Sequence, residues 1–202
     1  MSDLRSRIPR RDVPALSSLE KTYWGSDAIA EMLRALKIPY VLLNPGASFR
    51  GLHDSLVNHL GNDNPQILVV LHEEHAVSIA HGYAKVSGQP LAAILHSNVG
   101  LMHGSMAIFD AWCDRVPVLV LGATGPVDAA RRRPWIDWLH TAADQAALVR
   151  SFIKWDAQPA SPLAAGCSMR VRKDCQNPIM ASSPRKATGH APPPVRATCF
   201  AI

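Results

Sequence analysis

Apolar runs and helical patterns alternate along the chain between residues 26 and 155. Four runs are almost entirely apolar, without the alternation of a half-exposed strand: 40–43, 67–71, 91–95 and 117–121. Such runs are typical of parallel strands that are covered by helices on both faces. Other segments carry apolar residues at the three-and-four spacing of a helix: 26–36, 49–60, 76–87 and 103–112. With a further short strand expected at 152–155, the pattern predicts an α/β domain with three α/β/α layers and a mostly parallel sheet.

The two ends of the chain lack this pattern. Residues 1–21 are rich in Arg, Pro and Ser without periodicity, which predicts a flexible N-terminal arm. Residues 22–162 form the predicted domain. From residue 163 onward Cys, Pro and basic residues replace the periodic pattern, so 163–202 is predicted to be an aberrant, disordered tail. The sheet is therefore expected to lack its last helix and strand, and a frameshift or a mis-spliced end is one hypothesis for the abrupt change.

The net charge of +5 belongs to this tail. Six Lys and Arg residues and one acid, Asp174, follow Pro162, so the first 162 residues are balanced. A neutral domain argues against nucleic acid as a partner. No apolar run approaches the roughly 20 residues of a membrane helix, and the N-terminal arm has no apolar core of a secretory signal. We expect a cytoplasmic protein that has neither nucleic acid nor a membrane as its partner.

The candidate functional residues lie between the strand at 67–71 and the helix that follows it, in the sequence His72-Glu73-Glu74-His75. Open parallel sheets bind ligands at the carboxyl ends of their strands. Three turns built of small and polar residues are expected at the same edge: 44–48, 96–100 and 122–126. Glu73 is therefore the first candidate for chemistry, and Glu74 is expected to face solvent.

Several of these pieces resemble one known family in their order and spacing. They are Asn44-Pro45-Gly46, the segment 72–76 followed by Ala80-His81-Gly82-Tyr83-Ala84, and the turn 96–100 that leads into 106–117. From about residue 22 to 162 the chain is similar to the N-terminal, pyrimidine-binding domain of thiamine diphosphate-dependent enzymes of the acetolactate synthase and benzoylformate decarboxylase type. The resemblance implies the predicted α/β fold.

The resemblance also implies roles for individual residues. Glu73 matches the glutamate that hydrogen-bonds the pyrimidine nitrogen of the cofactor, and burial favours the protonated carboxyl that such a bond needs. His96 matches the histidine that benzoylformate decarboxylases use near the substrate; the other reading is a histidine satisfied by the backbone of its turn. Pro45, Gly46 and Ala47 are expected to pack against the cofactor. Those decarboxylases place a serine where this chain has Ala47, so a substrate-binding hydroxyl is not expected at that position.

Partners follow from the family in the same way. The family binds magnesium and the diphosphate through a Gly-Asp-Gly motif with a downstream Asn in another domain, and this pattern does not occur in the chain. We therefore expect a fragment that has no catalytic activity alone. Its full-length relatives are expected to decarboxylate or condense 2-oxo acids. The chain is expected to form a homodimer or to pair with a diphosphate-binding subunit, and FAD is a possible second cofactor in relatives. The alternative is a non-catalytic binding or assembly module, or a small subunit that completes a cofactor site with another chain.

The residues around Glu73 also raise the question of a metal site. A zinc-binding helix of the His-Glu-x-x-His kind places two histidines four residues apart, whereas His72 and His75 are three apart and straddle the strand end. We therefore expect no metal ligands in this stretch. His81 and His103 are expected to be ordinary histidines of a helix surface or an interface.

Overall fold

The computed structural model describes residues 12–14, 23–126, 128–159 and 196–201, the last segment by its backbone alone. Six strands form one sheet in the order β2-β1-β3-β4-β6-β5. Their bounds are β1 Tyr40–Leu43, β2 Gln66–Val69, β3 Ala92–Leu95, β4 Leu119–Thr124, β5 Trp155–Ala157 and β6 Arg196–Ala201. The pairs β1–β2, β1–β3 and β3–β4 are parallel, which confirms the mostly parallel sheet.

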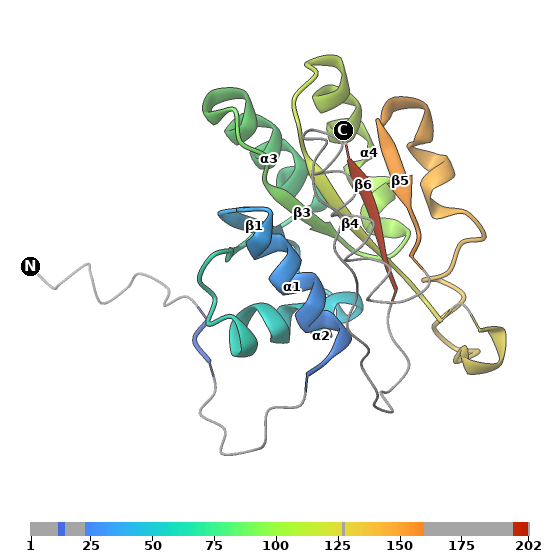
Figure 1. Ribbon diagram of the computed structural model, residues 1–202. Coiled ribbons are helices and arrows are strands. Elements are labelled where there is room, and N and C mark those ends of the chain that lie inside the picture. The colour runs from blue at the N-terminus through green and yellow to red at the C-terminus, as the bar shows by residue number, and fades with distance from the viewer. Residues whose placement is uncertain (1–11, 15–22, 127, 160–195, 202) are drawn as a thin grey trace, which may run out of the picture.

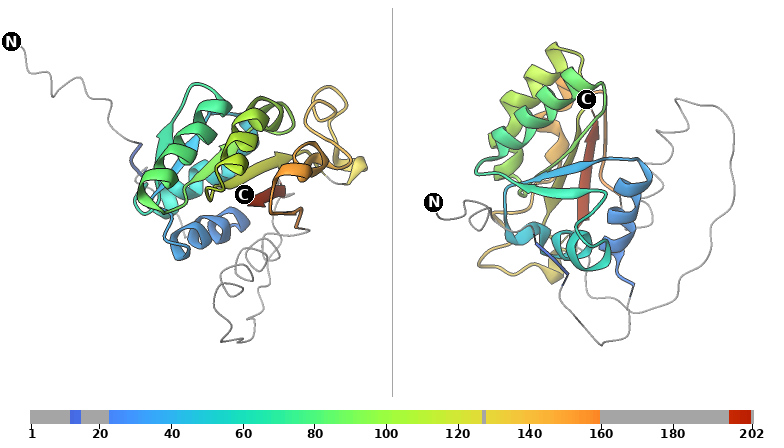
Figure 2. Two further views of the ribbon diagram at one scale, coloured as in Figure 1. Left: turned by 90° about the horizontal axis from the view of Figure 1, so that it is seen from above. Right: turned by 90° about the vertical axis from the view of Figure 1, so that its left-hand side faces the viewer.

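Helices cover both faces of this sheet (Figures 1 and 2). One face carries α1 and α2, and the other carries α3 and α4 side by side. The bounds are α1 Gly25–Ala35, α2 Arg50–Asp54, α3 Glu73–Ser87 and α4 Val99–Cys113, with short turns Ala47–Phe49 before α2 and Ser55–His59 after it. Further single turns follow β4, at Ala129–Arg131, Gln145–Leu148 and Arg150–Phe152. The predicted α/β/α layering is confirmed.

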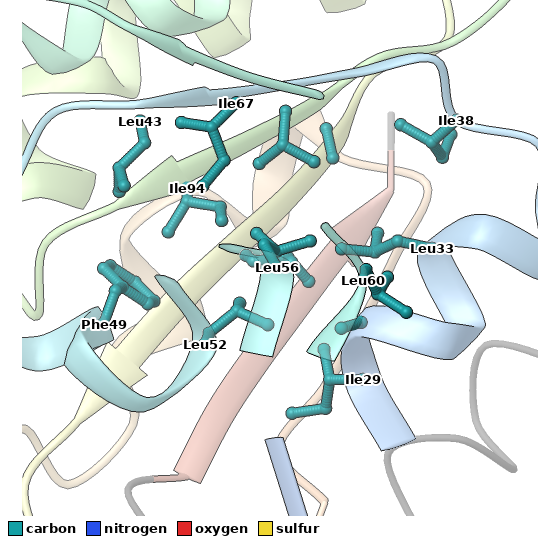
Figure 3. Packing of buried hydrophobic residues seen from close by; sticks show 14 of the residues in the cluster. Ile29, Leu33, Ile38, Leu43, Phe49, Leu52, Leu56, Leu60, Ile67 and Ile94 are labelled. Atoms are coloured by element: carbon teal, nitrogen blue, oxygen red, sulfur yellow. The ribbon is translucent and has the colours of Figure 1, made fainter. Parts of the chain in front are cut away.

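Alternate residues of each central strand enter different cores, which explains the unbroken apolar runs. In β1, Leu43 joins the core under α1 and α2, whereas its neighbour Leu42 joins the core under α3 and α4. In β3, Ile94 and Leu95 divide in the same way. Figure 3 shows Leu43 and Ile94 of the sheet beside Phe49 of the first core. Because both faces are buried, no polar residue interrupts these strands.

The segment 196–201 departs from the expectation of a disordered tail. It forms β6, which pairs antiparallel with both β4 and β5 and lies between them (Figure 1). Without a neighbour, the outer edge of β4 would expose unpaired backbone groups, and β6 satisfies them. The expected strand at 152–155 is shifted to Trp155–Ala157, because Phe152 belongs to the preceding turn. The rest of the predicted tail, 163–195 and 202, lies outside the described residues, as does most of the N-terminal arm.

None of the helices in the described part of the chain is long and apolar enough to span a membrane. The parallel register of β1 to β4 has a direct consequence for function. The segments that follow these four strands all leave the sheet at the same edge, so residues far apart in sequence meet there.

Candidate functional site

Glu73 is the first residue of α3 and follows the end of β2. Its residue surface is only 5% exposed. Among the described residues, no group lies within hydrogen-bond distance of its carboxylate. The nearest titratable side chain is that of His103 of α4, whose Nδ1 lies 3.7 Å from Oε2. The carboxylate is therefore largely shielded from water and accepts no hydrogen bond among the described residues, which leaves it able to bind a partner.

The backbone around Glu73 is fixed by the start of the helix. His72 has an extended backbone and serves as the cap, because its Nδ1 accepts a hydrogen bond from the backbone N–H of Glu74 at 3.2 Å. Glu74 is exposed, as expected. At the other end, Gly88 adopts a φ of 71° and closes the helix, a conformation that glycine takes without strain. The cap therefore sends Glu73 inward and Glu74 outward.

Gly100 brings Glu73 and His96 into one site. A Cβ atom at Gly100 would lie 3.1 Å from Oε1 of Glu73 and 3.0 Å from Cβ of His96. The two side chains therefore flank the start of α4, although they follow different strands, β2 and β3. The structure thus brings these two residues close together at the sheet edge, as predicted.

Two hydroxyl groups surround one nitrogen of His96. Nδ1 lies 3.0 Å from Oγ of Ser48 and 3.2 Å from Oγ of Ser97, and the two hydroxyl oxygens are 2.8 Å apart. Which atom donates in these contacts depends on the tautomer of the ring. In the tautomer whose Nδ1 accepts a hydroxyl proton, the ring proton is on Nε2. The ring is therefore oriented by two serine side chains, in addition to the turn that carries it.

Gly46 of the turn 44–48 packs against the Cδ2–Nε2 edge of the His96 ring. A Cβ atom at Gly46 would lie 2.5 Å from Cδ2 of His96 and 3.0 Å from Nε2, so only glycine permits this approach. Pro45 and Ala47 are exposed on either side of Gly46. Ala47 brings no hydroxyl, as expected, but the next residue, Ser48, supplies one. Contact of this turn with a cofactor remains a prediction.

His140 stacks on His96 from the segment after β4. The ring centroids are 5.1 Å apart and the planes differ by 18°. The Nδ1–H of His140 donates to the carbonyl oxygen of Ile136 at 3.0 Å, which fixes this ring. Burial lowers the pKa of His96 below its usual 6.5, repulsion from a charged His140 lowers the pKa further, and Glu73 acts in the opposite direction. The structure thus favours a neutral His96.

Titration of His96 gives a first testable prediction. By NMR, its imidazole should titrate below pH 6.5, and His140→Gln should move the pKa upward without restoring 6.5, because burial is the larger cause. As the pH falls, His96 is protonated at a higher pH in the unfolded chain than in the folded chain. The contribution of His96 to the free energy of unfolding should therefore drop below pH 6.5 and level off below the folded-state pKa. A pKa of 6.5 or more in the folded chain would contradict the account.

Sequence reasoning missed several residues of this site. His140 lies 44 residues after His96, in a segment with no strand or motif, and only the fold brings it near. Ser97 and Ser48 were recognised only as parts of turns. His103 was expected to be an ordinary surface histidine, although it lies closest to the carboxylate of Glu73. A helix that starts at 99 rather than 103 would have placed His103 one turn above the sheet edge, beside Glu73.

The chain is similar to several known proteins in sequence and in fold. The profile of the family described as thiamine pyrophosphate enzyme, N-terminal TPP binding domain, matches residues 23–148. The acetolactate synthase large subunit of Lactococcus lactis is 32% identical over 114 residues, which cover 56% of this chain and 19% of that protein. A protein of Pseudomonas aeruginosa described as a probable 2-ketoarginine decarboxylase is 29% identical over 147 residues, 71% of this chain and 24% of that protein.

A solved structure shows the same fold. The thiamine diphosphate-dependent 4-hydroxybenzoylformate decarboxylase of Rhodococcus jostii RHA1 superposes with a TM-score of 0.63 at 20% identity, over 74% of this chain and 27% of that one. The chain thus spans about a fifth to a quarter of the length of these relatives. Because the family profile covers more than half of the chain, the protein belongs to the thiamine pyrophosphate enzymes, through their N-terminal TPP-binding domain.

Proposed function

We propose that Glu73 binds the aminopyrimidine ring of thiamine diphosphate, and that the chain supplies this half of a cofactor site to an enzyme of 2-oxo acids. The observation that carries the proposal is the buried carboxylate of Glu73, which has no hydrogen bond among the described residues. The missing side chain at Gly100 keeps Oε1 uncovered on one side, because a Cβ there would lie 3.1 Å away. A nitrogen of the aminopyrimidine ring can accept a proton from the carboxyl group of Glu73 and so form the hydrogen bond that this group lacks.

The residues of the chain fit one part of the cofactor. When bound, thiamine diphosphate supplies the electron sink on which a 2-oxo acid loses carbon dioxide or is condensed with a second molecule. Glu73 offers a proton to the ring nitrogen, and its burial keeps most water away from that hydrogen bond. Pro45 and Ala47 are exposed at the same edge, and we propose that they pack against the cofactor together with Gly46, which the His96 ring covers on one side. The diphosphate and its magnesium ion are assigned to residues outside this chain, because the sequence has no Gly-Asp-Gly motif with a downstream Asn.

His96 is proposed to handle protons near the substrate. With Nδ1 occupied by the hydroxyls of Ser48 and Ser97, the proton on Nε2 is available to a substrate group. A neutral imidazole can donate that proton and take one back near pH 7. Ser48 and Ser97 act as positioning residues, since they fix the tautomer and do not themselves reach the substrate in this proposal.

Mixing with a second component tests the catalytic role. We expect the chain to release no carbon dioxide from pyruvate or benzoylformate with thiamine diphosphate and magnesium alone. Release should appear when a separately produced diphosphate-binding domain of a relative is added, and His96→Ala should reduce it by at least about a hundredfold if proton transfer is lost. No release in any mixture would contradict catalysis and favour the alternative, a non-catalytic assembly module.

An apolar surface on the helices of one face supports association with another chain. On α4 five large apolar residues recur at intervals of three or four residues, each between 40% and 58% exposed: Val99, Met102, Met106, Phe109 and Trp112. The neighbouring α3 adds Ile79 and Val86. Two helices that share such a stripe form a typical protein interface. We propose a homodimer through this α3–α4 surface, and pairing with a diphosphate-binding subunit is the other outcome.

Disrupting this surface gives a second testable prediction. Met106→Glu places a charge in the middle of the stripe and should convert a dimer into a monomer in sedimentation velocity experiments, because desolvating a charge in an apolar interface is costly. The matched control is Arg50→Glu, which changes an exposed residue of α2 on the other face of the sheet and should leave the dimer intact. A wild-type chain that is monomeric at tens of micromolar contradicts the homodimer and leaves the other subunit as the partner.

A further inference from the structure

His103 gives Glu73 a second kind of partner. One ligand atom from each of His72, Glu73 and His103 lies within 4.8 Å of the others. Nδ1 of His103 is 3.7 Å from Oε2 of Glu73. The rings of His72 and His103 stack with centroids 4.9 Å apart and planes 13° from parallel. Two imidazoles and a carboxylate from two helices therefore converge on one small volume.

We propose that His72, Glu73 and His103 bind a divalent transition metal such as Zn²⁺ or Co²⁺. Two histidine nitrogens and one carboxylate oxygen are a donor set that these metals prefer, whereas Mg²⁺ and Ca²⁺ prefer oxygen ligands throughout. This metal site rests on the proposed function in one respect, since Glu73 would bind both the metal and the aminopyrimidine ring. Metal and aminopyrimidine then exclude each other, and the metal holds the site closed to the cofactor.

Metal binding needs the His103 ring to turn out of its stack on His72, because the lone pairs of two parallel rings do not point at one metal. Around a tetrahedral metal with bonds of about 2.0 Å, neighbouring ligand atoms are about 3.3 Å apart. The present spacings are 3.7 Å between Nδ1 of His103 and Oε2 of Glu73 and up to 4.8 Å among the three ligand atoms. The side chain of His103 is 59% exposed and can move, whereas that of Glu73 is 7% exposed and stays fixed. Three protein ligands leave a fourth position for water, which makes the metal exchangeable.

Binding also has a cost at the start of α3. Nδ1 of His72 now accepts the hydrogen bond of the Glu74 backbone N–H. A neutral imidazole that accepts a hydrogen bond at one nitrogen carries its proton on the other. A metal that binds His72 must therefore either break the hydrogen bond at Nδ1 or replace the proton on Nε2. The largely buried carboxylate of Glu73, which accepts no hydrogen bond among the described residues, offsets this cost when it gains a cation.

Titration of the purified chain with CoCl₂ tests the site. We expect the visible absorption of Co²⁺ bound by nitrogen and oxygen, and displacement of Co²⁺ by Zn²⁺. His103→Ala and His72→Ala should each weaken Co²⁺ binding by at least about tenfold. The matched control is His75→Ala, because this exposed ring lies 5.6 Å from that of His72 but outside the three ligands. Binding of Co²⁺ that survives both ligand replacements, or no binding by the wild-type chain, overturns the proposal.

Competition separates this inference from the proposed function. Zn²⁺ should reduce binding of the thiamine aminopyrimidine to the wild-type chain but not to His103→Ala, which keeps Glu73 and loses only a metal ligand. Aminopyrimidine binding without Co²⁺ binding would overturn the metal site alone. Co²⁺ binding without aminopyrimidine binding would overturn the proposed function alone.

Discussion

Glu73→Gln is expected to weaken binding of thiamine diphosphate, or of its fragment 4-amino-2,5-dimethylpyrimidine, by at least about tenfold. A hydrogen bond that involves a charged group contributes about 1.5–3 kcal/mol, and every 1.4 kcal/mol is about a factor of ten in affinity. An amide at this position has the same shape but holds no acidic proton for the ring nitrogen. Isothermal titration calorimetry or NMR titration of the chain measures the change.

Two controls accompany this variant. Glu74→Gln removes the neighbouring carboxylate, which is exposed, and should leave the affinity unchanged. Thermal unfolding should show that Glu73→Gln is as stable as the wild type to within about 1 kcal/mol, because the carboxylate makes no hydrogen bond among the described residues. A large loss of stability with a parallel loss of binding would show instead that Glu73 supports the fold.

Gly100→Ala should destabilise the chain by about 1–3 kcal/mol, the usual cost of overpacking. The added Cβ would lie 3.0 Å from the carbonyl carbon of Leu95, which is backbone and cannot move aside. It would also press on Glu73 and His96 together, so aminopyrimidine binding should fall with stability. Chemical denaturation measures the first effect and NMR titration the second.

Gly82→Ala is the matched control for that change. Gly82 lies inside α3, and a Cβ there meets no atom within 4 Å. Alanine is the better helix former, so this variant should gain about 0.5–1 kcal/mol. Opposite signs for the two glycines would show that Gly100 is needed for space rather than for backbone freedom. Gly100→Ala that is as stable as the wild type would contradict the packing described for the start of α4.

The layers of the fold could be predicted because burial on both faces leaves a strong signal in the sequence. Leu42 and Leu43 enter opposite cores, so no polar residue breaks their strand. The helix around 103–112 gave a weaker signal. Its large apolar residues fall on more than one side, so spacing did not tell which residues face the sheet: Ile108 is fully buried and Met106 is 57% exposed.

The site could be predicted in part. Glu73 and His96 each follow a strand, and parallel strands bring their ends to one edge. Ser48 and His140 could not be assigned, because their places beside His96 depend on how two turns fold back over the sheet. Strand β6 could not be predicted either, since a six-residue segment gains its stability from pairing with β4 and β5 rather than from its own pattern.

The most direct test of the central claim is the protonation of a bound ring nitrogen. The fragment 4-amino-2,5-dimethylpyrimidine, labelled with ¹⁵N in the ring, is titrated with the wild-type chain and with Glu73→Gln while its ¹⁵N chemical shift is followed. The account predicts that one ring nitrogen moves toward its protonated shift with the wild type and stays at its free shift with Glu73→Gln. The same bound shift with both chains, or no binding by the wild type, would contradict it.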